Sequence, residues 1–301
     1  MRVLEFDSVS LAVDECGDKS SPAVLLLAGA TQSMDWWTPD FCGLLAEQGL
    51  RVIRFDQRDT GQSSASPPGS PDYSDADLAQ DPIRILDALG IGSAHVVGLS
   101  MGGGLAQLLG LRYPRRVRTL TLIESSPIGG ETAQLPAPCA ALVAAERDLP
   151  SVADWADTQE VIDYRVAAER PYAGSLGFDE FRVRAIATVE CERTTSMESA
   201  MSNHFLAGSG VPDGDSPEAT ALTDPSLIAA PTLVIHSDAD PFFPLPHGEA
   251  LAAMIPNATL LRIHGMGHEA PPPQLWGVVV PAIRDHVLGH DQPGAHDAGT
   301  A

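Results

Sequence analysis

Five residues, Gly98-Leu99-Ser100-Met101-Gly102, have the types and spacing that nucleophilic catalysis by a serine requires. They follow an apolar run that ends in His95-Val96-Val97 and precede a stretch with helical character. This order predicts a strand, a sharp turn and a helix, with Ser100 at the tip of the turn. Glycine on both sides leaves room for a strained serine backbone, and the helix N-terminus directs amide groups at whatever the hydroxyl attacks. Ser100 is therefore the predicted nucleophile.

A serine hydroxyl is a weak nucleophile at neutral pH, so it needs a histidine to accept its proton and a carboxylate to orient that histidine. His268 ends the segment Gly265-Met266-Gly267-His268, after the last predicted strand, and its neighbouring glycine allows close approach to the serine. Asp240 follows a predicted strand, Thr232–His236, and the carboxyl ends of parallel strands deliver active-site residues. We predict His268 as the general base and Asp240 as the acid.

Several residues compete for these roles. Asp238 and, at the end of an earlier strand, Glu124 are alternative acids, and His264 is the alternative base. The pattern favours a turn-forming role for Asp238 and a structural role for His264. The remaining candidate histidines lie in or beside strands or open a helix, which favours packing or capping; they are His95, His236 and His247.

The oxyanion that forms during acyl transfer needs backbone donors close to the nucleophile. One is predicted to be the N–H of Met101, directly after the serine, and the other the N–H of Ala30, in the loop after the first buried strand. A dinucleotide-binding loop is not predicted, since the segment around Ser100 lacks a G-x-G start.

The elements that position these residues alternate between strand and helix. The predicted strands are a hairpin over Val3–Glu15 and then Ala23–Leu27, Arg51–Asp56, Ala94–Leu99, Val117–Ile123, Thr232–His236 and Leu260–Ile263. Residues 125–229 interrupt the alternation with helical periodicity and prolines. We therefore predict a core domain over 1–124 and 230–289, an inserted helical lid over 125–229 and a disordered tail over 290–301. In the lid, the helical spacing of Met197, Met201 and Phe205 favours ordinary packing.

Several sequence blocks resemble a known family. They are residues 52–63 (VIRFDQRDTGQS), 94–102 (AHVVGLSMG), 231–235 (PTLVI) and the segment from Asp240-Pro241 to Gly265-Met266-Gly267-His268. The chain resembles the α/β-hydrolase fold family, and within it the cofactor-independent methylesterases of aromatic polyketide (anthracycline) antibiotics of the aclacinomycin methylesterase type. The resemblance implies an α/β class with a mostly parallel central sheet, helices on both faces and an inserted helical lid. It implies a Ser100, Asp240 and His268 triad with Ala30 and Met101 at the oxyanion hole, and no cofactor. The chain has Ala28-Gly29 where the wider superfamily often has His-Gly.

Charge and cysteine content limit the partners. Forty acidic residues against 18 basic ones give a formal charge of −22, which disfavours nucleic acid and anionic membranes as partners. Four separated cysteines without a metal-ligand pattern predict reduced thiols and no metal, and the start of the chain lacks the apolar core of a signal peptide. We expect a cytoplasmic protein with a small-molecule substrate, and predict no particular oligomeric state.

Three functions are compatible with these residues. The first is a serine esterase acting on a bulky aromatic natural product. The second uses the same pocket for cyclisation, carbon–carbon cleavage or perhydrolysis. The third is a ligand receptor derived from a hydrolase, which the presence of all three triad residues disfavours.

Overall fold

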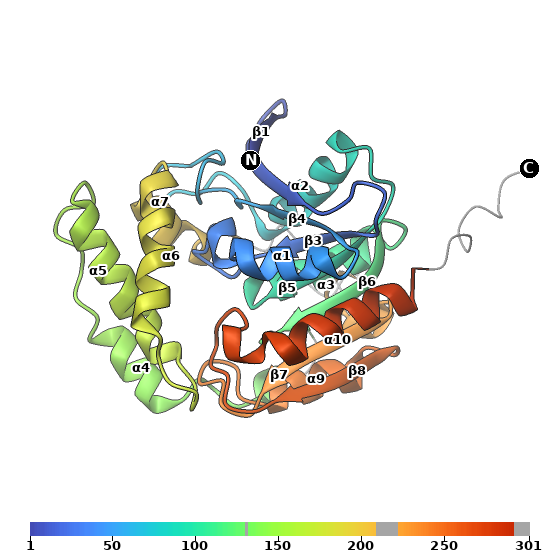
Figure 1. Ribbon diagram of the computed structural model, residues 1–301. Helices are drawn as coiled ribbons and strands as arrows, with labels where there is room; N and C mark the ends of the chain where they lie inside the picture. Colours follow the sequence, from blue (N-terminus) through green and yellow to red (C-terminus); the bar gives the residue numbers. More distant parts are fainter. Residues whose placement is uncertain (130–131, 209–221, 292–301) are drawn as a thin grey trace, which may run out of the picture.

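The computed structural model describes residues 1–129, 132–208 and 222–291 of the 301-residue chain. Its centre is an eight-stranded sheet in the order β1-β2-β4-β3-β5-β6-β7-β8 (Figure 1). The strands are β1 (Arg2–Glu5), β2 (Ser10–Cys16), β3 (Ala23–Leu27), β4 (Arg51–Phe55), β5 (Ala94–Leu99), β6 (Val117–Ile123), β7 (Thr232–Ser237) and β8 (Ala258–Ile263). β1 and β2 are antiparallel to their neighbours, and every pairing from β4 to β8 is parallel.

Helices cover both faces of this sheet. The core helices are α1 (Pro39–Glu47), α2 (Asp75–Ala88), α3 (Met101–Arg112), α9 (Pro246–Met254) and α10 (Trp276–Gly289). Apolar residues of α2, α3 and α9 share one buried cluster with the strands, and those of α1 and α10 share the other (Figure 1). Central strands that are covered twice must be apolar on both sides, which is why β3 and β5 are nearly continuous apolar runs. The predicted α/β-hydrolase architecture is confirmed.

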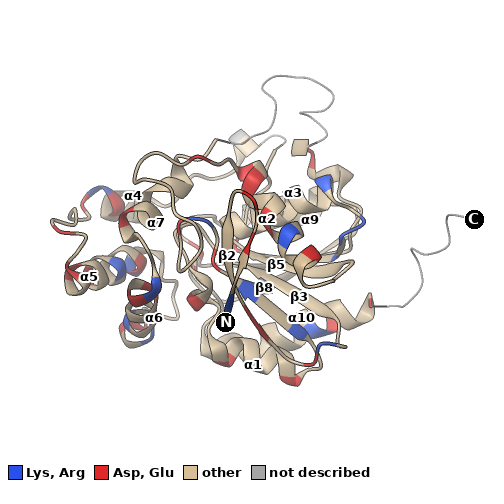
Figure 2. Cartoon of the chain, turned by 90° about the horizontal axis from the view of Figure 1, so that it is seen from above, with Lys and Arg blue, Asp and Glu red and all other residues tan. Residues whose placement is uncertain are grey.

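Of the described residues between β6 and β7, four α-helices stand beside the sheet, not on its faces (Figure 1). They are α4 (Ala140–Arg147), α5 (Thr158–Glu169), α6 (Glu180–Arg193) and α7 (Met197–Ser202). The helices α5 and α6 form a buried cluster of their own, which Trp36 of the core joins. Their other sides carry charges of both signs (Figure 2), including an ion pair of Arg184 with Asp163. The division into a core and a lid stays a prediction, and the lid is the name given to the described residues of the predicted segment 125–229.

Short 3₁₀ helices connect these elements. They are η1 (Met34–Trp36), η2 (Thr132–Gln134), η3 (Arg170–Tyr172), η4 (Asn203–Phe205), η5 (Pro225–Leu227) and η6 (Pro273–Leu275). Of the predicted tail, His290 caps α10 and Asp291 pairs with Arg118, whereas residues 292–301 lie outside the described residues. None of the helices in the described ranges has the length and apolar character needed to cross a membrane.

Candidate active site

Ser100 lies between the end of β5 and the start of α3. Its backbone has φ 52° and ψ −116°, a strained conformation for a residue other than glycine. The neighbouring backbone is packed too closely for side chains: a Cβ on Gly98 would lie 2.2 Å from the Gly102 carbonyl oxygen, and one on Gly102 would lie 2.5 Å from the Leu27 carbonyl oxygen. The two glycines therefore permit the turn that holds the serine at the edge of the sheet.

The structure brings Ser100, His268 and Asp240 together in one hydrogen-bonded chain. His268 Nε2 lies 2.8 Å from Ser100 Oγ, and His268 Nδ1 lies 2.8 Å from Asp240 Oδ2. The carboxylate can only accept, so Nδ1 carries the ring proton and Nε2 is free to accept the serine proton. This is the arrangement that activates a serine hydroxyl.

The carboxylate of Asp240 is buried and held at both oxygens. Its Oδ1 accepts hydrogen bonds from the backbone amides of Phe242 at 2.7 Å and Phe243 at 2.9 Å, which leaves Oδ2 for His268. Burial acts to raise the pKa of this carboxyl, but the charge of His268 and the hydrogen bonds keep that pKa below its ordinary value. Asp240 is thus ionised at neutral pH.

The loop that carries His268 docks on the lid. The His268 amide donates to the Tyr172 carbonyl at 2.8 Å, and a Cβ on Gly267 would lie 2.2 Å from the same oxygen. The close approach that this glycine allows is therefore to the η3 backbone, whereas the sequence suggested an approach to the serine. The rings of Tyr172, Phe242 and Phe243 lie against the imidazole.

The competing acid and base of the sequence analysis form a separate pair. Asp238 Oδ2 lies 2.6 Å from His264 Nδ1, and this pair is exposed and apart from the serine. The other histidines are engaged elsewhere: His95 bonds to a threonine hydroxyl and His247 to Ser126 and a backbone carbonyl.

The two predicted oxyanion donors line the same cavity as Ser100. Within the described parts of the chain, neither the Ala30 amide nor the Met101 amide donates a hydrogen bond to another protein group. Met101 is the first residue of α3, so the helix dipole adds to its ability to hold a negative oxygen.

The cavity above Ser100 has a volume of about 480 Å³, which is in the range of small-molecule sites. The core and the lid contribute similarly to its walls, and the lid side includes Tyr164, Tyr172, Met201 and Phe205. The packing role predicted for Met201 and Phe205 was therefore incomplete, because helical spacing does not tell which face a cavity will meet, whereas Met197 is buried.

Comparisons with known proteins agree with this geometry. Residues 22–272 match the model of the alpha/beta hydrolase fold family. The chain belongs to the α/β-hydrolase fold family. It is 31% identical to the rhodomycin D methylesterase of Streptomyces sp. (strain C5) over 90% of this chain and 92% of that protein. It is also 32% identical to the 2-hydroxymuconate semialdehyde hydrolase of Pseudomonas putida, over 74% of this chain and 72% of that protein.

A solved structure, the enol-lactonase from Burkholderia xenovorans LB400, has the same fold. The TM-score is 0.70 at 19% sequence identity, and the match covers 95% of this chain and 100% of the enol-lactonase. The family and its relatives identify the protein as a hydrolase.

In this hydrolase the lid holds the loop that follows β3. His204, in η4, accepts the Thr31 amide at Nδ1 (2.9 Å), while its Nε2 donates to the Arg58 carbonyl (2.8 Å). Burial lowers the pKa of His204, so the neutral ring makes both bonds. The sequence could not reveal this contact, because Thr31 and His204 are 173 positions apart in the chain.

A second contact comes from α6. Glu190 Oε1 accepts the Ser33 amide and the Trp36 indole N–H, each at 2.8 Å, and its Oε2 accepts Arg165 Nε at 2.9 Å. Arg165 also pairs with Glu169, and both line the cavity. A buried polar network thus joins two lid helices to the loop that carries Ala30.

Behind Asp240 lie two further buried groups, Glu124 and His236. One potential ligand atom from each of the three lies within 4.8 Å of the others, the spacing at which a metal could be held. His236 Nε2 lies 2.7 Å from the Phe243 carbonyl, which can only accept. That nitrogen therefore carries a proton and offers no lone pair to an ion.

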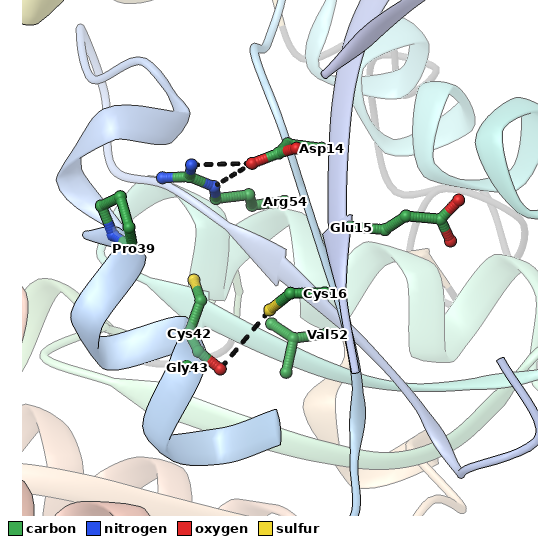
Figure 3. A pocket seen from close by; sticks show the side chains of 8 residues that line it. All are labelled: Asp14, Glu15, Cys16, Pro39, Cys42, Gly43, Val52 and Arg54. Atoms are coloured by element: carbon green, nitrogen blue, oxygen red, sulfur yellow. Dashed lines mark hydrogen bonds and ion pairs between the residues drawn. The ribbon is translucent and has the colours of Figure 1, made fainter. Parts of the chain in front are cut away.

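A smaller cavity of about 100 Å³ lies between β2, β4 and α1 (Figure 3). Its walls include the thiols of Cys16 and Cys42, and Cys16 Sγ donates to the Cys42 carbonyl at 3.6 Å. Burial raises the pKa of Cys42 to about 12 and raises that of Cys16 as well. Both groups are therefore protonated thiols at neutral pH, and neither is a nucleophile.

Proposed function

We propose that this protein is a serine esterase that hydrolyses a methyl ester on a bulky aromatic, polyketide-like natural product, as a step of antibiotic biosynthesis. The observation that carries the proposal is the hydrogen-bonded chain from Asp240 through His268 to Ser100, which ends at a cavity of about 480 Å³. The methylester part is supported by the rhodomycin D methylesterase, to which the chain is similar over nearly its whole length.

The reaction follows from the positions of the atoms. Ser100 Oγ attacks the ester carbonyl carbon as its proton passes to His268 Nε2, and Asp240 stabilises the imidazolium. The tetrahedral oxygen accepts hydrogen bonds from the Ala30 and Met101 amides. The C–O bond to the methoxy group then breaks as His268 gives its proton to the methoxy oxygen, which leaves as methanol. Water repeats the sequence on the acyl-enzyme, releasing the carboxylic acid and restoring Ser100.

The walls of the cavity favour an aromatic substrate. Tyrosine, phenylalanine and methionine side chains offer flat and adaptable apolar surfaces, including Tyr164, Tyr172, Phe242 and Met201. No group of the proposed reaction calls for a cofactor or a metal, and the partner is a small molecule. We propose the cytoplasm as the compartment, based on the four separated cysteines, all of which are free thiols in this fold.

Hydrolysis of a carbon–carbon bond is the second candidate. The 2-hydroxymuconate semialdehyde hydrolase, similar over about three quarters of this chain, favours it, because the substrate in its name has no ester bond to hydrolyse. Ser100 and His268 would act in either reaction, so the substrate that is turned over decides between ester hydrolysis and carbon–carbon bond hydrolysis.

The test is turnover of aromatic methyl esters, short aryl esters and a vinylogous 1,5-diketone by the wild type and by Ser100→Ala, His268→Ala and Asp240→Asn. Each substitution should lower ester kcat by about 10³-fold or more. Asp238→Asn is the matched control, since Asp238 belongs to the exposed pair with His264, and it should keep wild-type rates. Ester turnover that survives Ser100→Ala would contradict the proposal, diketone cleavage alone would favour the second candidate, and ligand binding without any turnover would favour a receptor.

A further inference from the structure

Glu124 is a buried carboxyl group that the proposed reaction does not use. It follows β6, and its backbone has φ 42°, in the left-handed region where residues other than glycine are strained. Its Oε1 accepts the Ser237 amide at 2.8 Å, and the side chain is fully buried. The strained backbone and this bond together direct the carboxyl group toward the loop after β7.

The other oxygen of Glu124 lacks a donor. Among the described residues no group donates a hydrogen bond to Oε2, although His236 Nε2 lies 3.4 Å from it. The proton of that nitrogen points to the Phe243 carbonyl. The other titratable groups that act on Glu124 are the carboxyls of Asp240 and, in the loop after β8, Glu269, whereas His268 acts on Asp240. One carboxyl oxygen of Glu124 lies within 4.8 Å of one of Asp240, and Oε2 is the oxygen to which no described group donates.

Two buried carboxyl groups this close cannot both be ionised, because their like charges repel and neither is solvated. Asp240 has the better anion site, with two backbone amides on Oδ1 and His268 on Oδ2. Glu124 has one amide. Burial, with the charge of Asp240 next, raises the pKa of Glu124 well above its ordinary value. The shared proton belongs on Glu124.

We propose that Glu124 is a positioning residue of this active site, which stays protonated and donates a hydrogen bond from Oε2 to the carboxylate of Asp240. This inference rests on the proposed serine mechanism, in which Asp240 orients His268. The added donor holds the second lone pair of Oδ2 and draws charge from the carboxylate, so it limits the basicity of His268. Without that donor Asp240 would bind the His268 N–H more strongly, and His268 would hold its proton to higher pH.

The test compares Glu124→Gln with Glu124→Ala in the full chain. The glutamine amide keeps both bonds, since its oxygen can accept from Ser237 and its NH₂ can donate to Asp240. We expect Glu124→Gln to keep kcat/KM for an aryl ester within about threefold, with the acid limb of the pH profile unchanged. Glu124→Ala should move that limb upward by about one pH unit. A purely structural role would lower the melting temperature without moving the limb.

A second readout does not depend on activity. The wild type at pH 7 should show the infrared band of a protonated buried carboxyl, and Glu124→Gln should lack it. Absence of that band, or equal loss of activity in Glu124→Gln and Glu124→Ala, would overturn the inference. If Glu124→Ala does not fold, the activity of Glu124→Gln and the infrared band of the protonated carboxyl still test the inference. Failure of the serine mechanism itself is seen separately, as ester turnover that survives Ser100→Ala.

Discussion

Replacing Glu190 by glutamine should weaken the buried network that joins α5 and α6 to the loop that carries Ala30. In the wild type the Glu190 carboxylate accepts three buried donors, from Ser33, Trp36 and Arg165. A glutamine side chain cannot accept on both sides. In one orientation it keeps the Ser33 and Trp36 donors but turns its NH₂ toward the Arg165 guanidinium; in the other it accepts from Arg165 but turns its NH₂ toward the Ser33 amide and the Trp36 indole. Arg165 is almost fully buried, and Glu169 alone would remain to pair with it.

The magnitude follows from the burial of that charge. Breaking a buried ion pair by removing one partner costs about 3–5 kcal/mol of the free energy of unfolding. For a chain of this size we expect the melting temperature to fall by about 5–8 °C. The Ala30 amide lies three residues before Ser33, so ester kcat should fall by about 10- to 100-fold, less than the full loss of an oxyanion donor.

The assay is thermal unfolding together with ester kinetics, and Glu192→Gln is the matched control. Glu192 lies on the same helix but is exposed, so its substitution should change neither quantity. If Glu190→Gln melts within about 2 °C of Glu192→Gln, the network does not hold the lid as argued. A lowered melting temperature with unchanged kcat would instead separate lid stability from the oxyanion loop.

Two further predictions concern the core. Gly98→Ala should abolish the folded protein or its activity, because the new Cβ would lie 2.2 Å from a backbone oxygen. Gly92→Ala is the control and should be tolerated, since its Cβ would meet nothing within 4 Å. Circular dichroism and kcat check both variants, and a stable, active Gly98→Ala would refute the packing argument. Burial lowers the pKa of His95 to about 4, so the unfolded chain takes up a proton there first as the pH falls. Stability from this group is present above pH 6.5 and is lost between pH 6.5 and about 4, at most about 3 kcal/mol. Urea unfolding at both pH values should show that His95→Asn removes this part of the loss and that His264→Asn, at an exposed site, does not.

The sequence was sufficient for the parts of the site that lie at strand ends. The strands β3, β5 and β6 begin and end where the pattern predicted. In β3 and β5 the reason is that a parallel strand covered on both faces is a nearly continuous apolar run. Because the carboxyl ends of parallel strands lie at the same edge of the sheet, the residues that follow β5, β7 and β8 come close together. This is why Ser100, Asp240 and His268 could be predicted as one site. Their catalytic roles remain a proposal.

The contacts between the lid and the core could not be predicted from the sequence, for a physical reason. Periodicity indicates that α6 is a helix, but not that Glu190 on it meets the Ser33 amide. A glutamate in a helical pattern normally predicts an exposed position. Glu190 is buried, and only the three donors around its carboxylate explain this. Phe205 was misjudged for the same reason, since its spacing fits a core face while its side chain lines the cavity.

Two of the three candidate acids, Glu124 and Asp240, lie close together in the structure. Glu124 and Asp240 follow neighbouring strands, β6 and β7, whose register pairs Ile123 with Ile235. Their carboxyl groups therefore meet at the same edge of the sheet, and only Asp240 reaches His268. A neutral Glu124 behind an ionised Asp240 reconciles both carboxyl groups with a single catalytic histidine. On this argument, activity should depend on the length and hydrogen-bonding capacity of residue 124 and not on its charge.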